Sequence, residues 1–524
     1  MKLEGAQAAR VRAWPLMREY GLFRRLLRLG VFALACLSAA GCTDAPGEAL
    51  RFGLAEVPSM FDPRFATDAV SDRVNRLLYR QLTDLDERGM PVPALASWQR
   101  ITPTHYRFRL GSEGREFHDG TRLTAWDVKT TYDYVLDAAH ASPQRVAIAH
   151  VRSVEVLDED TVDFHLERPD PLFPAYLAIA ILPAQRIAAG HDFRRAPIGS
   201  GPFAFLDRPD DNRVRLVRRS DGQVVEFVRV PDPTMRALKL VRGELDMMQN
   251  DLPPELLRYL AGRPELRVVR GRGTNFAYLG FNLNDPVTGR REVRQAIAHA
   301  IDRDAIIEHV LAGAARPADA LLPPDHWAGG KGLHGYTYAP ERARELLAQA
   351  GHDQNHPLRL TYKTSSDPFR VRLATILQHQ LGGVGIQVEI RSFDWGTFYG
   401  DIKAGRFQMY SLAWVGVKTP DIFRYAFHSG SLPPQGANRG GLRSARADRL
   451  IERAEAAADL EAQGEYYRQL QAHLLEELPY VPLWYEDHVF VAREDIAGYD
   501  LAADGNYDGL IHVRRGGAAR GGRP

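Results

Sequence analysis

Cysteine is almost missing from this chain of 524 residues, which contains only Cys36 and Cys42. Because both lie near the amino terminus, the body of the chain has no cysteine pair for a disulfide. The sequence also lacks Cys-x-x-Cys, His-Glu-x-x-His, a phosphate-binding loop and a Gly-x-Ser-x-Gly elbow. Its 17 histidines show no metal-ligand spacing. We therefore predict no metal and no cofactor, and we favour a binding protein over an enzyme.

Strong charge and long apolar runs are missing too. The formal net charge is +1, which gives no reason to expect a nucleic-acid partner. Apolar residues make up 45% and charged residues 25% of the chain, the balance of a soluble globular protein. Its length indicates two or three domains rather than one core.

The first 42 residues have the pattern of an export signal. They carry seven basic and two acidic residues, a charge of +5, so about −4 remains for the rest. The apolar run 29–41 is too short for a bilayer, which needs roughly 20 residues, but suits a signal peptide. It ends in Leu37–Cys42, which resembles a bacterial lipobox with Cys42 as the lipidated residue. A plain signal cleavage near Ala40 is the alternative, and Met17 is a possible start.

Local patterns predict the first elements. Leu50–Leu54 reads as a strand, and an apolar face predicts a helix over Thr67–Leu85. Thr124 and Asp127 have the spacing of a helix capping box. Residues 514–524 are rich in Gly and Arg and are predicted to be disordered.

Residues 358–416 alternate between strand and helix patterns and predict a parallel sheet with right-handed crossovers. Ligands of such sheets bind beyond the carboxyl ends of the strands. Those ends are Lys363–Arg370, Ser392–Trp395 and Trp414–Asp421, and we expect the binding site there.

Several short motifs stand out along the chain: Leu95-Ala96-Ser97-Trp98, Tyr106-Arg107-Phe108-Arg109-Leu110, Phe117-His118-Asp119-Gly120, Leu123–Val128, Gly199-Ser200-Gly201-Pro202-Phe203, Tyr278-Leu279-Gly280-Phe281-Asn282, Val293-Arg294-Gln295-Ala296, Ala300-Ile301-Asp302-Arg303 and Gly383–Ile386. Together they resemble family 5 of the bacterial extracellular solute-binding proteins, the oligopeptide, dipeptide and nickel binders. The resemblance spans about residues 50–500. We interpret the turn and cap residues among them as structural rather than ligand-contacting.

The resemblance implies an α/β, bilobal fold of the type II periplasmic-binding-protein kind, with an extra domain inserted in the first lobe. The implied base domain combines 50–76, 195–272 and 491–513. The implied insert spans 77–194 and the second lobe 273–490. The lobes would cross near Gly271–Thr274 and Val491, where hinge motion would close them on a ligand.

Seven residues are candidates for ligand contact, and each has a plainer alternative. Asn275 and Tyr278 follow the first crossing, where strand packing is the alternative. Arg370 could pair with a carboxylate or lie on a solvated helix face, and Trp414 could line a pocket or the core. The remaining candidates are Trp395, Asp421 and Arg439.

One position departs from the family pattern. In relatives that recognise a peptide amino terminus, an Asp stands three residues after the Trp that corresponds to Trp414, whereas this chain has Val417. The nearest acid is Asp421, which could pair with an ammonium group or cap a following helix.

The sequence thus predicts a periplasmic, lipid-anchored binding component of an ABC importer. Its expected partners are a peptide or peptide-like ligand, the permease subunits and the membrane holding the anchor, and we expect a monomer. Two alternatives stay open: a receptor for a metal chelate, sugar or modified peptide, and an enzyme or peptide chaperone on the same scaffold.

Overall fold

The computed structural model describes residues 49–353 and 355–516. The predicted leader with Cys42, and the end of the predicted tail at 517–524, lie outside the described residues. Within the described part, no helix has both the length and the apolar character that crossing a bilayer requires.

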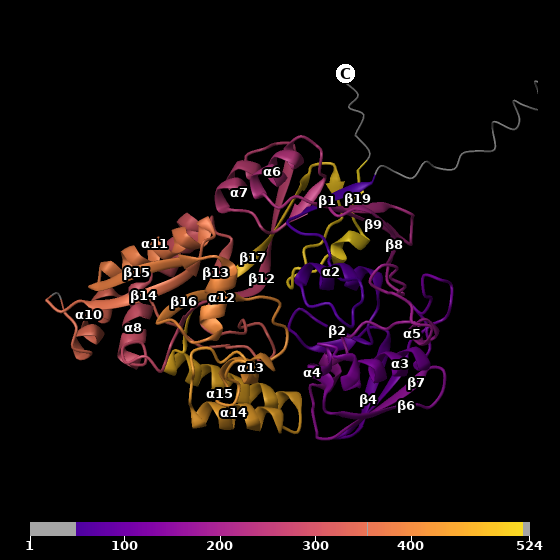
Figure 1. Ribbon diagram of the computed structural model, residues 1–524, viewed down its shortest axis with the longest axis horizontal. Helices are drawn as coiled ribbons and strands as arrows, with labels where there is room; N and C mark the ends of the chain where they lie inside the picture. The colour runs from indigo at the N-terminus through magenta and orange to yellow at the C-terminus, as the bar shows by residue number, and fades with distance from the viewer. Residues whose placement is uncertain (1–48, 354, 517–524) are drawn as a thin grey trace, which may run out of the picture. The chain divides into compact units, whose positions relative to one another are not determined.

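One mixed sheet runs through most of the described chain (Figure 1). Its order is β15 (Ile386–Phe393), β14 (Leu358–Ser365), β16 (Met409–Trp414), β12 (Leu266–Phe281), β17 (Tyr480–Arg493), β11 (Met247–Gln249), β1 (Leu50–Leu54), β10 (Val224–Arg229), β9 (Arg213–Arg218) and β8 (Phe203–Asp210), and β13 (Ala315–Pro317) pairs with β17. As predicted, β14 is parallel to both β15 and β16.

The long strands β12 and β17 connect the two ends of this sheet. They pair antiparallel from Leu266–Arg493 to Gly280–Tyr480, with a register shift between Gly271 and Asn275. At that shift a β-carbon on Gly273 would lie 2.1 Å from the Glu486 carbonyl oxygen. The close approach of the two backbones therefore requires glycine there.

Helices cover both faces of the β12–β16 half of the sheet. Side chains alternate along β12, so Ala277 and Leu279 face one core and Phe276 and Tyr278 the other. The first face is covered by α8 (Arg291–Ala300), α10 (Pro340–Gln349) and α11 (Pro368–Gly382). The second is covered by α12 (Trp395–Lys403), α13 (Ile422–Phe427), α14 (Ala445–Glu455) and α15 (Leu460–Glu477). The short α9 (Arg303–Ala305) follows α8.

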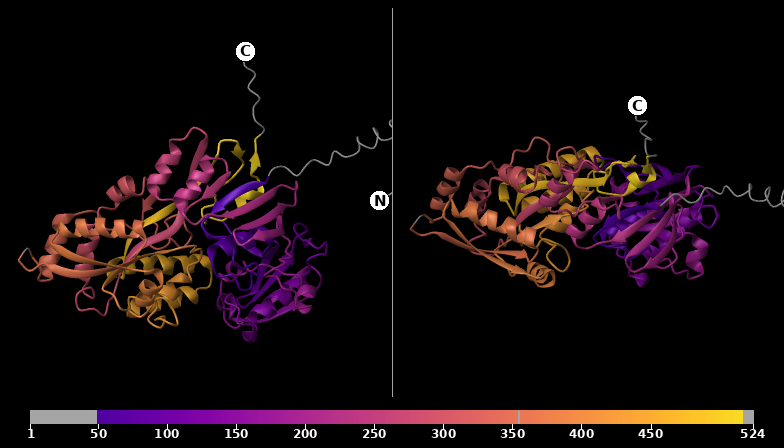
Figure 2. Two further views of the ribbon diagram at one scale, coloured as in Figure 1. Left: turned by 45° about the horizontal axis from the view of Figure 1, so that its top comes forward. Right: turned by 90° about the horizontal axis from the view of Figure 1, so that it is seen from above.

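The opposite half has its own core, built from three separated parts of the chain. Phe52 of β1 contacts Tyr499 and Tyr507, with ring centroids 6.3 and 5.1 Å away. Figure 2 shows the indigo start and the yellow end of the described chain side by side. Helices here are α2 (Ala69–Leu78), α6 (Pro233–Val241) and α7 (Pro254–Ala261).

Residues between α2 and β8 form a second, four-stranded antiparallel sheet. Its order is β4 (Ala96–Thr102), β5 (His105–Leu110), β7 (Thr161–Leu166) and β6 (Val151–Val156). Its inner face packs against α3 (Ala125–Leu136), and nearby lie α4 (Arg145–Ile148), α5 (Ala184–Ala188) and the hairpin β2 (Thr83–Leu85) and β3 (Pro91–Pro93). The predicted capping box is present: Thr124 N donates to an Asp127 carboxylate oxygen at 2.7 Å.

Two predicted elements differ from the structure. The helix predicted over Thr67–Leu85 ends at Leu78, because Leu82 is buried in the core of the four-stranded sheet. Arg514 and Arg515, predicted as the start of a disordered tail, pair as β19 (Arg514–Arg515) with β18 (Ile496–Ala497). Arg515 also pairs with the buried Asp246 at 2.9 Å, which holds this end in place.

The Gly199–Phe203 motif has a structural explanation. Gly201 N donates to the Leu78 carbonyl oxygen at 2.9 Å, so the motif lies against the end of α2. A β-carbon on Gly201 would lie 2.3 Å from the Leu77 carbonyl oxygen. The contact is with backbone, which cannot move aside as a side chain can.

We predict that Gly201→Ala lowers the free energy of unfolding by about 1–3 kcal/mol, because the added methyl group must displace backbone. Urea unfolding followed by circular dichroism measures this. The control is Gly382→Ala at the end of α11, where no atom lies within 4 Å of the added carbon. Equal urea midpoints for the two variants would contradict the packing role of Gly201.

Candidate ligand-binding site

The carboxyl ends of β14, β15 and β16 meet at one edge of the sheet. Asp367 and Asp394 begin the helices that follow β14 and β15, and their carboxylates accept hydrogen bonds from Arg370 N and Thr397 N at 2.9 and 3.1 Å. The loops after all three strands therefore reach the same edge, where a parallel sheet binds its ligands.

A cavity opens where β14 and β16 separate. These strands pair only at Tyr362–Met409 and Lys363–Tyr410, and beyond that point the cavity, of about 200 Å³, lies between their ends. We call it the strand-end cavity. It is lined by Ala277, Tyr278, Tyr362, Thr364, Ser365, Arg370, Leu373, Leu377, Trp395, Phe398, Ser411, Leu412, Ala413, Val415, Leu483 and Trp484.

The lining of the strand-end cavity is apolar with few polar groups. The candidates Tyr278, Arg370 and Trp395 belong to it, and Arg370 is its only charged residue. The indole N–H of Trp484 is buried and has no acceptor within the described part of the chain. Mostly apolar walls with a few polar groups are usual for small-ligand sites.

Arg439 lies in a cage of aromatic residues beside this cavity. Its guanidinium donates to the hydroxyls of Tyr278 and Tyr399 at 3.2 and 3.1 Å. It also lies over the Trp414 ring, 4.9 Å from the centroid. We call these four residues the arginine cage. Among the described residues, no carboxylate lies within ion-pair distance of Arg439, whose side chain is half-buried.

Large apolar side chains are exposed around the cage. Trp395 is 59% and Tyr425 48% exposed. Trp395 stacks on Tyr399, with ring centroids 5.4 Å apart, and Tyr425 contacts the edge of Trp414 at 6.2 Å. Exposed aromatic side chains next to a cavity are available for contact with a ligand.

Asn275 and Arg370 are both neighbours of Glu486. Asn275 stands opposite Glu486 in the β12–β17 register, and an Arg370 nitrogen lies 3.6 Å from a Glu486 carboxylate oxygen. Asn275 also accepts a hydrogen bond from Gly416 N at 3.4 Å. Arg370 therefore has an acidic partner, in contrast to Arg439.

Asp421 lies at the end of the segment that joins β16 to α13. It precedes α13, but its side chain makes no capping hydrogen bond and instead accepts one from the Thr419 hydroxyl. The residue is exposed, yet desolvation by surrounding protein, with Asp170 also nearby, raises the pKa of its carboxyl.

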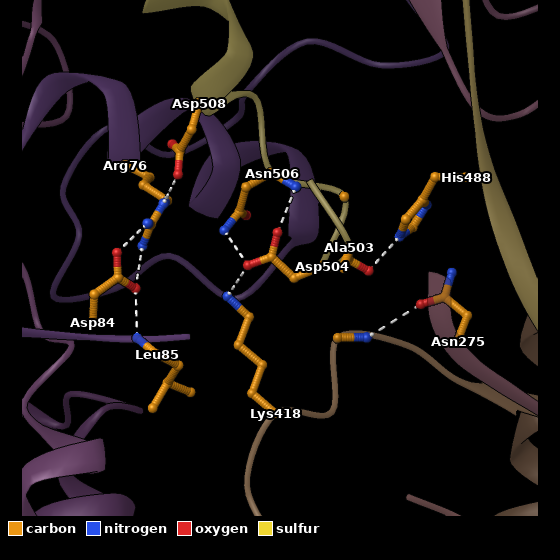
Figure 3. Close-up of polar contacts among 12 residues, drawn as sticks. Arg76, Asp84, Leu85, Asn275, Lys418, His488, Ala503, Asp504, Asn506 and Asp508 are labelled. Carbon is orange, nitrogen blue, oxygen red and sulfur yellow. Dashed lines mark hydrogen bonds and ion pairs between the residues drawn. The ribbon is translucent and has the colours of Figure 1, made fainter. Parts of the chain in front are cut away.

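The loop after β16 also contacts the C-terminal segment (Figure 3). The Lys418 ammonium lies 2.8 Å from Asp504, which in turn accepts from Asn506 N at 3.0 Å. Beside them Arg76 joins Asp84 and Asp508. Despite desolvation, the Lys418 ammonium holds the pKa of Asp504 below its usual range.

Sequence reasoning missed several of these residues. Lys418 lies inside the predicted strand-end loop Trp414–Asp421, and Tyr399 stands one helical turn after Trp395, so both had a local signal. Asp504 and Trp484 had none, because their places depend on contacts between distant segments.

The α/β fold, with a cavity at the carboxyl ends of parallel strands, is the arrangement in which such sheets bind small solutes. A profile of "Bacterial extracellular solute-binding proteins, family 5 Middle" matches residues 90–432, more than half of the chain. The chain belongs to this family, as the sequence motifs predicted.

Curated relatives match along most of the chain. Di/tripeptide-binding protein 1 of Pseudomonas aeruginosa is 28% identical over 510 residues, covering 89% of this chain and 94% of that protein. The dipeptide-binding protein of Escherichia coli is 26% identical, covering 90% and 95%.

Solved structures share the fold. The periplasmic binding protein DppA of Helicobacter pylori, in complex with peptide STSA, is 25% identical with a TM-score of 0.73 over 90% of this chain and 98% of that one. The substrate-binding protein CtaP of Listeria monocytogenes is 22% identical with a TM-score of 0.81 over 90% and 100%. These likenesses confirm the predicted fold class.

We predict that Asp421→Asn raises the melting temperature at pH 7. The pKa of Asp421 is raised from its usual 3.8, so the folded chain favours the protonated form and ionisation costs stability as pH rises through this pKa. The difference in melting temperature between variant and parent should shrink as pH falls from 7 toward 4, because Asp421 then becomes protonated in the parent. Differential scanning calorimetry at several pH values checks this.

Asp504→Asn is the matched control with the opposite sign. Because the pKa of Asp504 is lowered, its ionised form stabilises the fold, and its loss should lower the melting temperature at pH 7. A drop of similar size in both variants would contradict the raised pKa of Asp421.

Proposed function

We propose that this solute-binding protein captures peptides or peptide-like solutes in the periplasm and delivers them, as a monomer, to the permease of an ABC importer. Relatives named as di- and tripeptide-binding proteins support a peptide ligand. The leader ending at Cys42 supports export and attachment to a membrane by lipid.

The arginine cage is the observation that carries this proposal. A half-buried guanidinium without a carboxylate partner is costly, and a ligand anion would offset that cost. Trp414 and the two tyrosine hydroxyls fix the plane of the guanidinium, which suits a bidentate hydrogen bond to a carboxylate. We assign Arg439 to the carboxylate of the ligand, and Trp395 and Trp414 to its apolar parts.

The strand-end cavity would hold one side chain of the ligand. The strands line this cavity with small side chains, among them Ala277, Ser411 and Ala413, which leave space for a ligand group. Its volume of about 200 Å³ accommodates a side chain of medium size. With Arg370 already beside Glu486, the lining suits an uncharged side chain. Tyr278 belongs to both cavity and cage, so the two sites would be occupied together.

The loop after β16 decides how the protein could bind the amino terminus of a peptide. Val417 and Lys418 offer no acid to an ammonium group, and Lys418 is already paired with Asp504. Asp421, at the end of the same loop, supplies a carboxylate, and we propose it as the ammonium partner. Val417 in place of an acid favours a second candidate, a solute without a free ammonium group, such as a modified peptide.

Closure around the ligand follows from the proposed domains. We take 50–76, 195–272 and 491–513 as the base domain, 77–194 as the insert and 273–490 as the second lobe. The Lys418–Asp504 ion pair then joins the second lobe to the base domain. Bending near Gly271–Thr274 would open the lobes by breaking such contacts.

We propose binding rather than catalysis at this site. The described residues that line the strand-end cavity include no histidine, cysteine, lysine or carboxylate, so they offer no general base for a hydroxyl nucleophile. Mass spectrometry should therefore recover added peptides intact after incubation with the protein.

We predict that Arg439→Gln weakens binding of peptides with a free carboxylate by about 2–5 kcal/mol, the cost of truncating a buried charge pair. Calorimetric titration with a defined pool of di- to pentapeptides measures this. C-terminally amidated peptides should bind the parent weakly, and Arg439→Gln should change their affinity little. N-acetylated peptides separate the ammonium contact from the carboxylate contact.

The matched control is Arg359→Gln at the amino end of β14, an exposed arginine at the far edge of the sheet. It should bind like the parent. Equal affinity for free and amidated pools would contradict the assignment of Arg439. Failure of the parent to bind any pool would reject the peptide ligand itself.

We predict that Cys42→Ala releases the protein from membranes into the soluble periplasmic fraction, because lipidation needs this thiol. Cell fractionation with immunoblotting checks this, with Cys36→Ala as the control that should remain membrane-bound. A Cys42→Ala protein that sediments with membranes like the parent would show that lipid on Cys42 is not the anchor.

A further inference from the structure

Two histidines face each other on the four-stranded sheet, far from the ligand site in sequence. The register of β5 and β7 places His105 opposite His165 and Arg107 opposite Asp163. Alternation puts these four side chains on the outer face of the sheet, while Tyr106 and Phe164 fill the core on its inner face. Directly opposite residues of antiparallel strands are close enough to share one small ligand.

The donor atoms converge. His105 Nε2 lies 2.9 Å from an Asp163 carboxylate oxygen, and the two imidazole rings stack with centroids 4.4 Å apart. One ligand atom from each of His105, Asp163 and His165 lies within 4.8 Å of the others. The two imidazoles are about one-fifth exposed and Asp163 is buried, so an ion could enter from solvent.

The surroundings hold the carboxylate in place. Arg107 donates to both Asp163 oxygens at 2.8 Å, an outer contact of the kind that orients metal ligands. Arg107 also adds a positive charge, which weakens attraction for a cation. Glu155 offsets it, because its carboxylate lies 3.6 Å from His165 Nε2 and adds a second negative charge beside the rings.

We propose that His105, His165 and Asp163 form a binding site for a divalent transition-metal ion of the zinc type. Two imidazoles and a carboxylate are a usual ligand set for such ions, which bind nitrogen and oxygen at about 2.0–2.2 Å. The ion replaces the proton shared between His105 and Asp163, so that pair needs little movement. His165 reaches the ion by a side-chain rotation.

This site is independent of the proposed ligand. Spacing along the sequence gave no sign of it, because 60 residues separate His105 from His165 and only the strand register unites them. Cross-strand chelation would tie β5 to β7 and stabilise the sheet by mass action.

The test uses the full chain, stripped with a chelator and then exposed to zinc chloride. The parent should retain about one zinc ion per chain after gel filtration and should melt at a higher temperature with zinc. His165→Ala should weaken zinc binding at least about tenfold. Cobalt chloride supplies a second readout, since imidazole coordination changes its visible spectrum.

His379→Ala is the matched control, an exposed histidine on α11 outside the cluster, and it should bind zinc like the parent. His165 makes no hydrogen bond to Asp163 in the described structure, so its variant tests the site even if His105→Ala misfolds. Equal zinc retention by the parent and His165→Ala would overturn the proposal. So would a parent that retains no zinc.

Discussion

The pairing of β12 with β17 sets the position of nearly everything else in the described chain. Strand β17 continues to β11 and β1 at one end, while β12 continues to β16 and then β14 at the other. The register also decides which side chains enter which core. A slip of one residue would exchange Tyr278 for Ala277 and remove a hydroxyl from the arginine cage. Two strands thus fix both the packing and the chemistry of the site.

Charge is distributed unevenly around the strand ends. Arg370, Lys363 and Lys418 each have a carboxylate partner at 3.6, 2.6 and 2.8 Å. Within the described part of the chain, Arg439 has instead two tyrosine hydroxyls and the rings of Tyr399 and Trp414. Asp367 and Asp394 at the same edge cap helices instead of pairing with a cation among the described residues. The ligand carboxylate that we propose would therefore reach one guanidinium without breaking an existing ion pair, so that the site would be preorganised for it.

The sequence predicted best those features that depend on neighbours along the chain. The parallel strands of 358–416 and the capping box at Thr124 follow from local periodicity and capping, and both are present. The helix after Thr67 was predicted too long because the apolar spacing continues to Leu82, although Leu82 packs in a different core. Tyr278, Arg439 and Trp414 were all candidates from the sequence, but the contacts among them were not predicted. Arg439 meets Tyr399 from 40 residues away and Asp504 meets Lys418 from the other end of the fold, so only tertiary structure reveals these pairs.

The loop from Trp414 to Asp421 makes specific side-chain contacts at both ends and in the middle. Trp414 completes the arginine cage, Lys418 pairs with Asp504 of the C-terminal segment, and Asp421 accepts a hydrogen bond from Thr419 just before α13. Each of these side chains can be substituted separately. An inserted or deleted residue, however, would move at least two of them away from their partners, which belong to other segments of the chain. Variation in this loop during evolution should therefore consist of substitutions at constant length, so that specificity diverges while the spacing of the loop is inherited unchanged.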